Sequence, residues 1–358
     1  DETAKAEIIM LTKAVYARDE SILEAYTKGR QASLDKFATI YERLGPRFDH
    51  FFFESEVWER GKELVEQHVG DIFTQSAGAV VYEGEQDGLH TRVFINSAGV
   101  TTYEAKDLGL AYAKRERWEF DESISVTAVE QDQYFKVVFA ALGKIDDWFI
   151  GKMKNIPHGM MQLADGKMSS RKGKVISGED LLNEARDTAL EKMKDNESIA
   201  GDVETADQVG VAAIKYLVLK QSIGKNITYD LERALSFEGD SGPYLQYTTA
   251  RINSVLEKAR AAGVEAGVAN VPEVPYEIEK LIYRYPEVVR EAAAQYEPHT
   301  LVTYLTELAG TFNTFYAYEK IADASDEYAP YKAAVAVAVR QTLKNGLWVL
   351  AIKAPERM

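Results

Sequence analysis

The chain has 358 residues, of which 46% are hydrophobic and 28% charged, and its net charge is −15. This length predicts at least two domains, and the acidic balance excludes a protein that coats nucleic acid non-specifically, because such binding comes from Lys and Arg at phosphates. The sequence holds no cysteine, its five histidines lack metal-ligand spacing, and it has no apolar run of the roughly 20 residues that span a membrane. We therefore predict a cytoplasmic protein without a bound metal or a membrane segment.

The first half of the chain alternates helices with strands. Apolar residues recur at helical spacing over about the first 45 residues, and a further helical stretch ends near Val69. Such alternation indicates an α/β sheet, in which ligands bind beyond the carboxyl ends of the strands. Later helices are expected at about 105–114 and 133–142. The expected strands are 79–82, 91–95, 124–129 and 158–164.

The second half of the chain has helical patterns only. Strand signals disappear after Ser177, and an apolar stripe from Leu301 to Tyr316 suits a helix bundle. Residues 263–275 are rich in Gly, Ala, Val and Pro and predict an exposed connection. The expected helices are 178–194, 203–221, 243–262, 277–295, 300–320 and 330–350.

A basic loop separates the two halves. Residues 166–174 hold four cations, two hydroxyls and two glycines, and the wider segment 151–176 has six cations against Asp165 alone. Glycine lets backbone N–H groups approach a ligand, and cations suit phosphate oxygens. This loop is either a polyphosphate-binding loop or a solvated surface loop.

Four blocks, in the right order, resemble one family. Residues 165–173 (DGKMSSRKG) resemble the KMSKS loop of the class I aminoacyl-tRNA synthetases, in the version found in arginyl-tRNA synthetases. Residues 234–251 resemble the opening of that family's helical anticodon-binding domain, and residues 354–358 resemble its C-terminus. Phe48-Asp49 with Glu54-Ser55 is similar to a block that follows the family's inserted region. The resemblance covers almost the whole chain.

The resemblance implies a fold and a domain plan. We expect an α/β part, which is the second half of a class I Rossmann-like catalytic fold, followed by an all-α helix-bundle anticodon-binding domain. The expected boundaries are 1–176 for the catalytic part with the KMSKS-type loop, 177–233 for a helical stem-contact linker, and 234–358 for the DALR-type anticodon-binding domain.

Two departures from the family bear on activity. No HIGH-type motif is present, because His68-Val69-Gly70-Asp71 lacks the last residue and lies after the Phe48 block instead of before it. The second KMSKS lysine is Ser170, and either Arg171 or Lys172 could replace its charge. We therefore expect the C-terminal portion of a synthetase without its N-terminal half, whether by truncation or by a natural split.

The implied function is arginine–tRNA ligase. Such an enzyme uses ATP with Mg²⁺ to convert L-arginine to arginyl-adenylate and then transfers arginine to the 3′ end of tRNA-Arg. We expect a monomer that is inactive as this fragment alone. The alternative is a non-catalytic tRNA-binding accessory protein derived from the synthetase.

The resemblance also assigns residues to the nucleotide. Cations and hydroxyls of the loop are expected to hold the β- and γ-phosphates, and the segment before the loop is expected to contact adenine. A structural role for His158 stays open. The catalytic candidates are Lys167, Ser169, Ser170, Arg171 and Lys172. The ATP-binding candidates are His158, Gly159, Met160, Lys167 and Met168.

Tyr103, Asp107 and Gln131 are the candidates for the arginine side chain. A guanidinium has five donors in a fixed plane, so its pocket needs carboxylate, hydroxyl or amide acceptors. The family uses a Tyr and an Asp at this spacing and a Gln at the next strand end. Glu130 and Gln133 compete with Gln131, while Tyr103 could instead pack and Asp107 could be a helix-start charge.

Aromatic and basic residues near the start of the helical domain are candidates for RNA contact. Single-stranded loops are recognised by stacking and by hydrogen bonds to base edges. Tyrosines on bundle helices can equally belong to the core. The candidates are Tyr244, Gln246, Tyr247, Arg251 and Met358.

Overall fold

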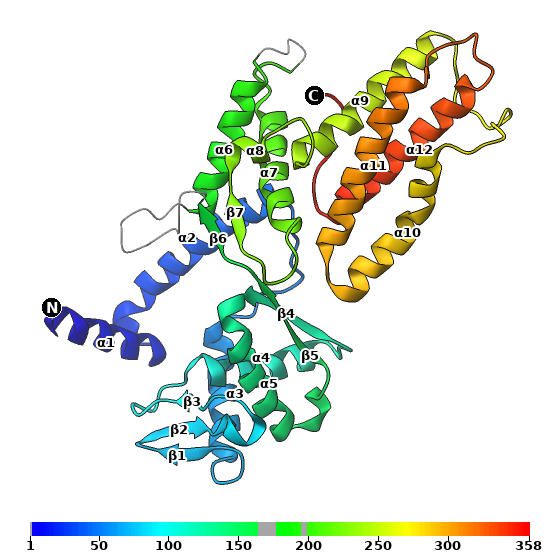
Figure 1. Cartoon of the computed structure of the whole chain (residues 1–358). Helices are drawn as coiled ribbons and strands as arrows, with labels where there is room; N and C mark the ends of the chain where they lie inside the picture. The colour runs from blue at the N-terminus through cyan, green and yellow to red at the C-terminus, as the bar shows by residue number, and fades with distance from the viewer. Residues whose placement is uncertain (1, 164–176, 195–198) are drawn as a thin grey trace. The chain divides into compact units, whose positions relative to one another are not determined.

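The computed structural model describes residues 2–163, 177–194 and 199–358. The chain divides into two units, Asp1–His158 and Gly159–Met358 (Figure 1). None of the described helices is long and apolar enough to cross a membrane. The α/β-then-helical plan is confirmed, while the expected boundaries at residues 176 and 233 stay a prediction.

The first unit contains the alternation expected from the sequence. The helices expected in the first 45 residues, before Val69 and after residues 105 and 133 are confirmed. Its elements are α1 (Glu2–Tyr16), α2 (Glu20–Leu44), α3 (Glu54–Gln67), β1 (Thr74–Ser76), β2 (Ala79–Tyr82), β3 (Arg92–Ile95), α4 (Tyr103–Arg117), β4 (Ser123–Ala128), α5 (Asp132–Ile145) and β5 (Met153–His158), with 3₁₀ turns at Gly84–Asp87, Val129–Gln131 and Asp147–Phe149.

The strands of this unit form two small sheets. β1, β2 and β3 pair antiparallel, whereas β4 and β5 pair parallel, from Ser123 opposite Met153 to Ala128 opposite His158. α5 is the crossover between the two parallel strands, as a parallel connection requires. β5 has no counterpart in the sequence prediction, because a strand with Lys154, Asn155 and Pro157 lacks the expected apolar β-branched run. The strand predicted at 158–164 is therefore wrong in its start, since His158 ends β5.

Close packing of α3 against α4 holds α4 in place. A Cβ at Gly61 on α3 would lie 1.9 Å from the carbonyl oxygen of Ala105, and one at Gly109 on α4 would lie 2.1 Å from that of Val57. Only glycine permits this backbone approach. The buried side chains around these helices include Phe73, Tyr82, Phe94, Leu108, Tyr134, Val137 and Leu142.

The second unit is mainly helical but also contains strands. β7 corrects the expectation that strands end at Ser177. It has three residues, too few to show a period in the sequence, and it exists through parallel pairing with β6, with Met161 opposite Ile227. Its elements are β6 (Met161–Leu163), α6 (Gly178–Lys192), α7 (Val203–Leu219), β7 (Ile227–Tyr229), α8 (Leu231–Ala234), α9 (Gly242–Ala261), α10 (Glu277–Gln295), α11 (Pro298–Tyr318) and α12 (Ala329–Val349).

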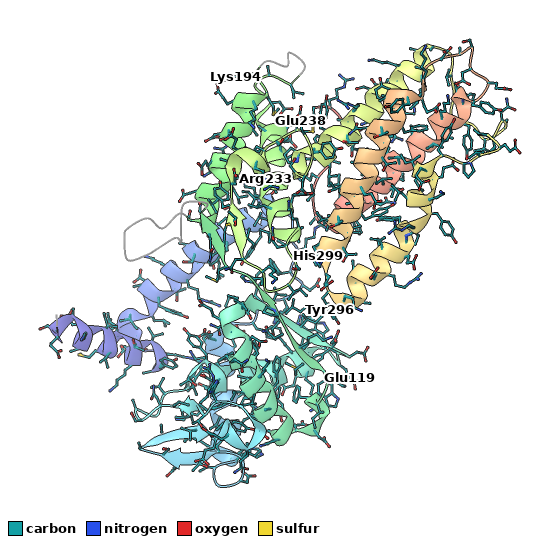
Figure 2. The ribbon with its side chains drawn as sticks, viewed as in Figure 1. Glu119, Lys194, Arg233, Glu238, Tyr296 and His299 are labelled. Atoms are coloured by element: carbon teal, nitrogen blue, oxygen red, sulfur yellow. The ribbon has the colours of Figure 1, made fainter. Side chains whose placement is uncertain are left out.

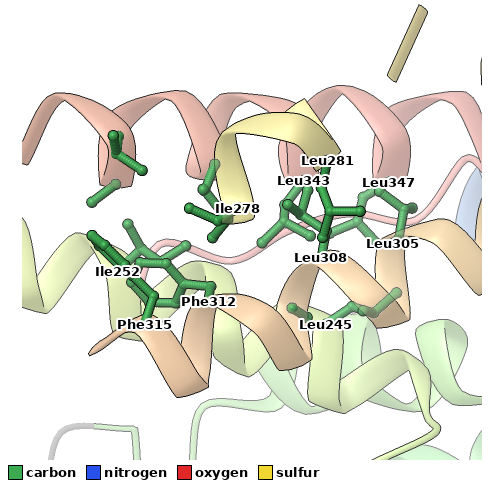
Figure 3. Close-up of a cluster of buried hydrophobic side chains, with 14 of the residues drawn as sticks. Leu245, Ile252, Ile278, Leu281, Leu305, Leu308, Phe312, Phe315, Leu343 and Leu347 are labelled. Carbon is green, nitrogen blue, oxygen red and sulfur yellow. The ribbon is translucent and has the colours of Figure 1, made fainter. Parts of the chain in front are cut away.

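Helices α9 to α12 pack around one apolar core. The expected helices correspond to them closely, and α10 has the predicted bounds. Figure 3 shows side chains from all four helices meeting in this core. The fully buried members include Leu245, Ile252, Leu305, Leu308, Phe312, Leu343 and Leu347.

Lys332 is a buried cation in this bundle. Its Nζ lies 2.6 Å from Glu319 Oε2 and 2.7 Å from Asp326 Oδ2, and its side chain is 9% exposed. Burial alone would lower the pKa of Lys332, but the hydrogen bonds with Asp326 and Glu319 raise it to about 12. The same contact lowers the pKa of Asp326.

We expect Lys332→Met to lower the free energy of unfolding by about 2–3 kcal/mol, because it leaves two carboxylates without their partner. The contribution of Lys332 is present below its ordinary pKa and is lost only as pH rises through about 12. That of Asp326 is lost as pH falls below 3.8. Urea titrations should therefore show a difference in the free energy of unfolding between wild type and Lys332→Met that is full at neutral pH and shrinks in acid. The control, Lys280→Met, removes an exposed pair with Glu277 and should change stability by less than about 1 kcal/mol; equal losses would contradict the prediction.

Candidate functional site

Asp107 is a half-buried carboxylate on α4. The hydroxyl of Tyr134 on α5 donates a hydrogen bond to its Oδ2 at 2.5 Å. Burial raises the pKa of Asp107, while the Tyr134 hydrogen bond and the nearby Lys114 oppose that rise. Among the residues that the structure describes, Oδ1 has no hydrogen-bond partner. Asp107 therefore offers one carboxylate oxygen to an external cationic donor.

Tyr103 begins the same helix and lies one turn before Asp107. Its side chain is 68% exposed, so it does not pack in the core of this unit. Lys106 Nζ lies 5.0 Å from the Tyr103 ring and binds Glu54 Oε2 at 2.7 Å. The phenol of Tyr103 is thus available at the start of α4.

Gln131 ends the short turn that follows β4 and directly precedes α5. It is exposed, as are the competing Glu130 and Gln133, so exposure does not distinguish the three. No hydrogen bond joins Gln131 to Tyr103 or Asp107 within the described ranges. The structure does bring Asp107 to the first turn of α5, through Tyr134, three residues after Gln131.

His158 lies at the carboxyl end of β5, where it pairs with Ala128 at the carboxyl end of β4. It is exposed. In parallel sheets this edge is the one at which ligands bind. The position is therefore compatible with the predicted nucleotide contact.

Gly159 and Met160 belong to the second unit, where they directly precede β6 and contact the residues just before β7. A Cβ at Gly159 would lie 1.8 Å from the carbonyl oxygen of Lys225. The N–H of Met160 donates to Asn226 Oδ1 at 3.0 Å. The close approach predicted for Gly159 is thus made to the protein backbone, and a contact of Gly159 or Met160 with adenine stays a prediction.

The basic loop holds the remaining nucleotide candidates. Its predicted phosphate-binding and nucleotide-binding residues lie outside the described residues, and their roles stay predictions. They are Lys167, Met168, Ser169, Ser170, Arg171 and Lys172.

A cavity of about 550 Å³ in the second unit is lined by four of the five residues predicted to contact RNA. Tyr244, Tyr247 and Arg251 of α9 line it together with Met358. Glu238, labelled in Figure 2, comes from the segment between α8 and α9. The other lining residues are Lys192, Met193, Ile199, Phe237, Gly239 and Asn313.

Hydrogen bonds fix the polar side chains of this cavity. Arg251 Nη2 donates to the Tyr247 hydroxyl at 3.1 Å, and Arg251 Nη1 donates to Asn313 Oδ1 at 3.0 Å. Asn313 Nδ2 donates in turn to the Tyr244 hydroxyl at 2.9 Å. Asn313 is absent from the residues predicted from the sequence, although it is an amide next to Phe312 in the apolar stripe of α11.

Gln246 faces the interior. It is fully buried, and its Nε2 donates to the carbonyl oxygens of Lys353 at 2.7 Å and Gln208 at 3.3 Å. The RNA contact predicted for Gln246 is therefore wrong in this structure: the side chain holds the C-terminal segment. Asn253 does the same through Glu356, donating to its backbone oxygen at 3.0 Å and to Oε2 at 2.8 Å. Both contacts help to fix the segment that ends at Met358.

Comparisons with known proteins define the class. Residues 7–231 match the family described as tRNA synthetases class I (R), catalytic domain, and residues 245–358 match the DALR anticodon binding domain. The order of these matches is that of a class I synthetase, with a catalytic part followed by a helical anticodon-binding part.

Individual relatives agree with this class. Over the whole length of this chain, it is 33% identical to arginine–tRNA ligase 1 of Bacillus cereus. Over 95% of this chain, it is 32% identical to arginine–tRNA ligase of Limosilactobacillus reuteri. The structure of Thermus thermophilus arginyl-tRNA synthetase matches all of this chain with a TM-score of 0.82 and 25% identity. The chain belongs to the arginyl-tRNA synthetase family. It spans 64% of the B. cereus relative, 61% of the L. reuteri relative and 67% of the T. thermophilus chain.

Proposed function

We propose that this chain is the part of an arginine–tRNA ligase that holds the arginine side chain, closes on ATP and binds the anticodon of tRNA-Arg. The observation that carries the proposal is the half-buried Asp107, whose Oδ2 is held by Tyr134 and whose Oδ1 has no partner among the described residues. Family membership supplies the reaction class. The protein would act as a cytoplasmic monomer with ATP and Mg²⁺.

In the first reaction step a carboxylate oxygen of arginine attacks the α-phosphorus of ATP, and pyrophosphate leaves. Asp107 Oδ1 accepts a charge-assisted hydrogen bond from the guanidinium, and Tyr103 and Gln131 add hydroxyl and amide contacts. This places the substrate beside the carboxyl ends of β4 and β5, where His158 lies. The protein's main contribution is to position the reactants.

Charge on the departing phosphates needs cations. Lys167 and either Arg171 or Lys172 of the loop would neutralise that charge, and Mg²⁺ would arrive with the ATP phosphates. In the second step a ribose hydroxyl at the 3′ end of tRNA-Arg attacks the carbonyl carbon of the adenylate, and AMP leaves. Because no HIGH-type motif occurs in this sequence, the chain alone is expected not to perform the first step.

The cavity of the second unit would take an unstacked base of the anticodon loop. Tyr247 and Tyr244 offer aromatic rings, and Arg251 offers donors at the cavity wall. Stacking on aromatic rings and hydrogen bonds to base edges are the usual means of binding such bases. Met358 would form an apolar part of the wall.

Arg251→Ala is expected to weaken binding of a tRNA-Arg anticodon hairpin by about 10- to 100-fold, because it removes a base contact and releases Tyr247 and Asn313. Fluorescence anisotropy on this chain measures the effect. Arg260→Ala is the matched control, since Arg260 is an exposed arginine on the same helix and outside the cavity. Equal losses in the two variants would reduce the role of Arg251 to general electrostatics.

Arginine-dependent ATP–pyrophosphate exchange, with and without tRNA-Arg, tests the enzyme proposal. The assay should compare this chain with the full-length product of its gene. Exchange by the full-length product supports the ligase. Hairpin binding without exchange in either protein would instead select the tRNA-binding accessory protein.

A further inference from the structure

Tyr134 is the residue through which the fold holds Asp107. It lies in the first turn of α5, its side chain is buried, and its hydroxyl donates to Asp107 Oδ2 at 2.5 Å. Asp107 is on α4, so this contact joins the two helices that flank the candidate arginine site.

The ring of Tyr134 is itself held by its neighbour on α5 and by a residue of β3. Phe135 packs against it edge to face at 5.0 Å, and the Arg92 guanidinium lies 5.3 Å from its centre. Arg92 is on β3, and its Nη1 binds Oε1 of the buried Glu104 at 3.1 Å. Glu104 is on α4, three residues before Asp107. A chain of contacts through β3, α4 and α5 thus returns to Asp107 and restricts its rotamer.

We propose that Tyr134 is the positioning residue of the arginine site: its hydroxyl occupies Oδ2 of Asp107 and leaves Oδ1 aimed at the substrate guanidinium. This inference rests on the proposed function. It assigns Tyr134 no contact with the substrate. With one lone pair of Oδ2 used by Tyr134, Oδ1 is the oxygen of Asp107 that has both lone pairs available to the guanidinium, and a group with five donors needs further acceptors besides Asp107.

Tyr134 also favours the charged form of Asp107. The groups that act on this carboxylate are Tyr134 on α5, Lys114 and Glu104 on α4, and Glu54 on α3. Burial raises the pKa of Asp107 and the Tyr134 hydrogen bond opposes that rise. Burial and the neighbouring carboxylate raise the pKa of Tyr134, so its hydroxyl remains a donor at any physiological pH. Removing the hydroxyl should therefore raise the pKa of Asp107.

The test is Tyr134→Phe, which keeps the buried ring and removes only the hydroxyl. Calorimetric titration of the full-length gene product with arginine, from about pH 5 to about pH 9, should show two changes. At neutral pH the affinity should fall by about 10- to 100-fold, because Asp107 loses the contact that fixes its rotamer, and a misplacement of about 1 Å in a site can cost about 100-fold. The pH midpoint below which binding disappears should also move upward, because a protonated Asp107 cannot pair with a cation.

Tyr112→Phe is the control, since it removes a hydroxyl on α4 that bonds Asp146 at 3.4 Å, away from Asp107. An unchanged pH midpoint in Tyr134→Phe, or the same affinity loss in Tyr112→Phe, would overturn the positioning role. If Tyr134→Phe folds poorly, a double variant with Asp107→Ala, which removes the acceptor altogether, decides. The effect of Tyr134→Phe on the free energy of unfolding should shrink in the Asp107→Ala background, and equal effects in both backgrounds would reject the contact.

Failure of the proposed function gives a different result. A wild-type protein that binds no arginine at any pH rejects the arginine site and, with it, the guanidinium part of this inference. A ¹³C-carboxyl titration of Asp107 in this chain then still reports the Tyr134 contact. An upward pKa shift in Tyr134→Phe supports the contact, and no shift rejects it.

Discussion

Asp107→Asn is expected to weaken arginine binding by about 100- to 1,000-fold, because it removes the negative charge of a half-buried acceptor that faces a cation. The asparagine oxygen can still accept the Tyr134 hydrogen bond, so the local geometry should survive. Calorimetry with the full-length gene product measures the loss. Glu116→Gln, which neutralises an exposed carboxylate on the same helix, should leave the affinity within about threefold of wild type.

Asp107→Asn should not destabilise the fold at neutral pH. The pKa of Asp107 is raised in the folded state from its ordinary 3.8, mainly by burial, so the folded state binds this proton more tightly than the unfolded state does. Folding stability then falls as pH rises through the interval between the two pKa values, and ionised Asp107 lowers stability above it. Asparagine lacks this effect. Melting curves from about pH 4 to pH 7 should show that the melting temperature of Asp107→Asn rises relative to that of wild type as pH rises. A melting temperature that falls further below that of wild type as pH rises would contradict the prediction that Asp107 is kept for binding at a cost in stability.

Gly61→Ala is expected to lower the free energy of unfolding by more than about 3 kcal/mol, because overpacking against backbone forces two helices apart. The added Cβ would lie 1.9 Å from the carbonyl oxygen of Ala105 on α4. Since α4 carries Tyr103 and Asp107, arginine binding should fall as well. Urea unfolding followed by circular dichroism measures the change.

Gly29→Ala is the matched control for that substitution. Gly29 lies within α2, where a Cβ would meet nothing within 4 Å. The same chemical change should there raise stability, by up to about 1 kcal/mol, through helix propensity alone. Similar losses at both positions would contradict overpacking against α4 as the cause of the loss at Gly61.

Much of the fold follows from local patterns in the sequence. The amphipathic stripe of α11 and the turn-bounded ends of α10 predict both helices well, because burial and the helical period point the same way. β5 and β7 do not, since one contains Lys154, Asn155 and Pro157 and the other has three residues. Both strands exist through pairing with a partner distant in sequence, which no local window contains.

In the candidate sites, too, motifs predict some residues, and others are recognised only from three-dimensional contacts. Motif resemblance led to Tyr244, Tyr247, Arg251 and Met358, and the structure places all four around one cavity. It also led to Gln246, which turns inward because its place on α9 faces the C-terminal segment. Asn313 and Tyr134 were missed, since each acts by holding another side chain in a three-dimensional contact that spacing along the chain does not reveal.

Transfer of labelled amino acids to tRNA by the full-length gene product tests the central claim most directly. Each amino acid should be offered with ATP, Mg²⁺ and total tRNA, and the charged tRNA identified. The proposed function predicts that arginine alone is attached and that it is attached to tRNA-Arg. Charging with another amino acid, or no charging while the anticodon hairpin is still bound, would contradict it.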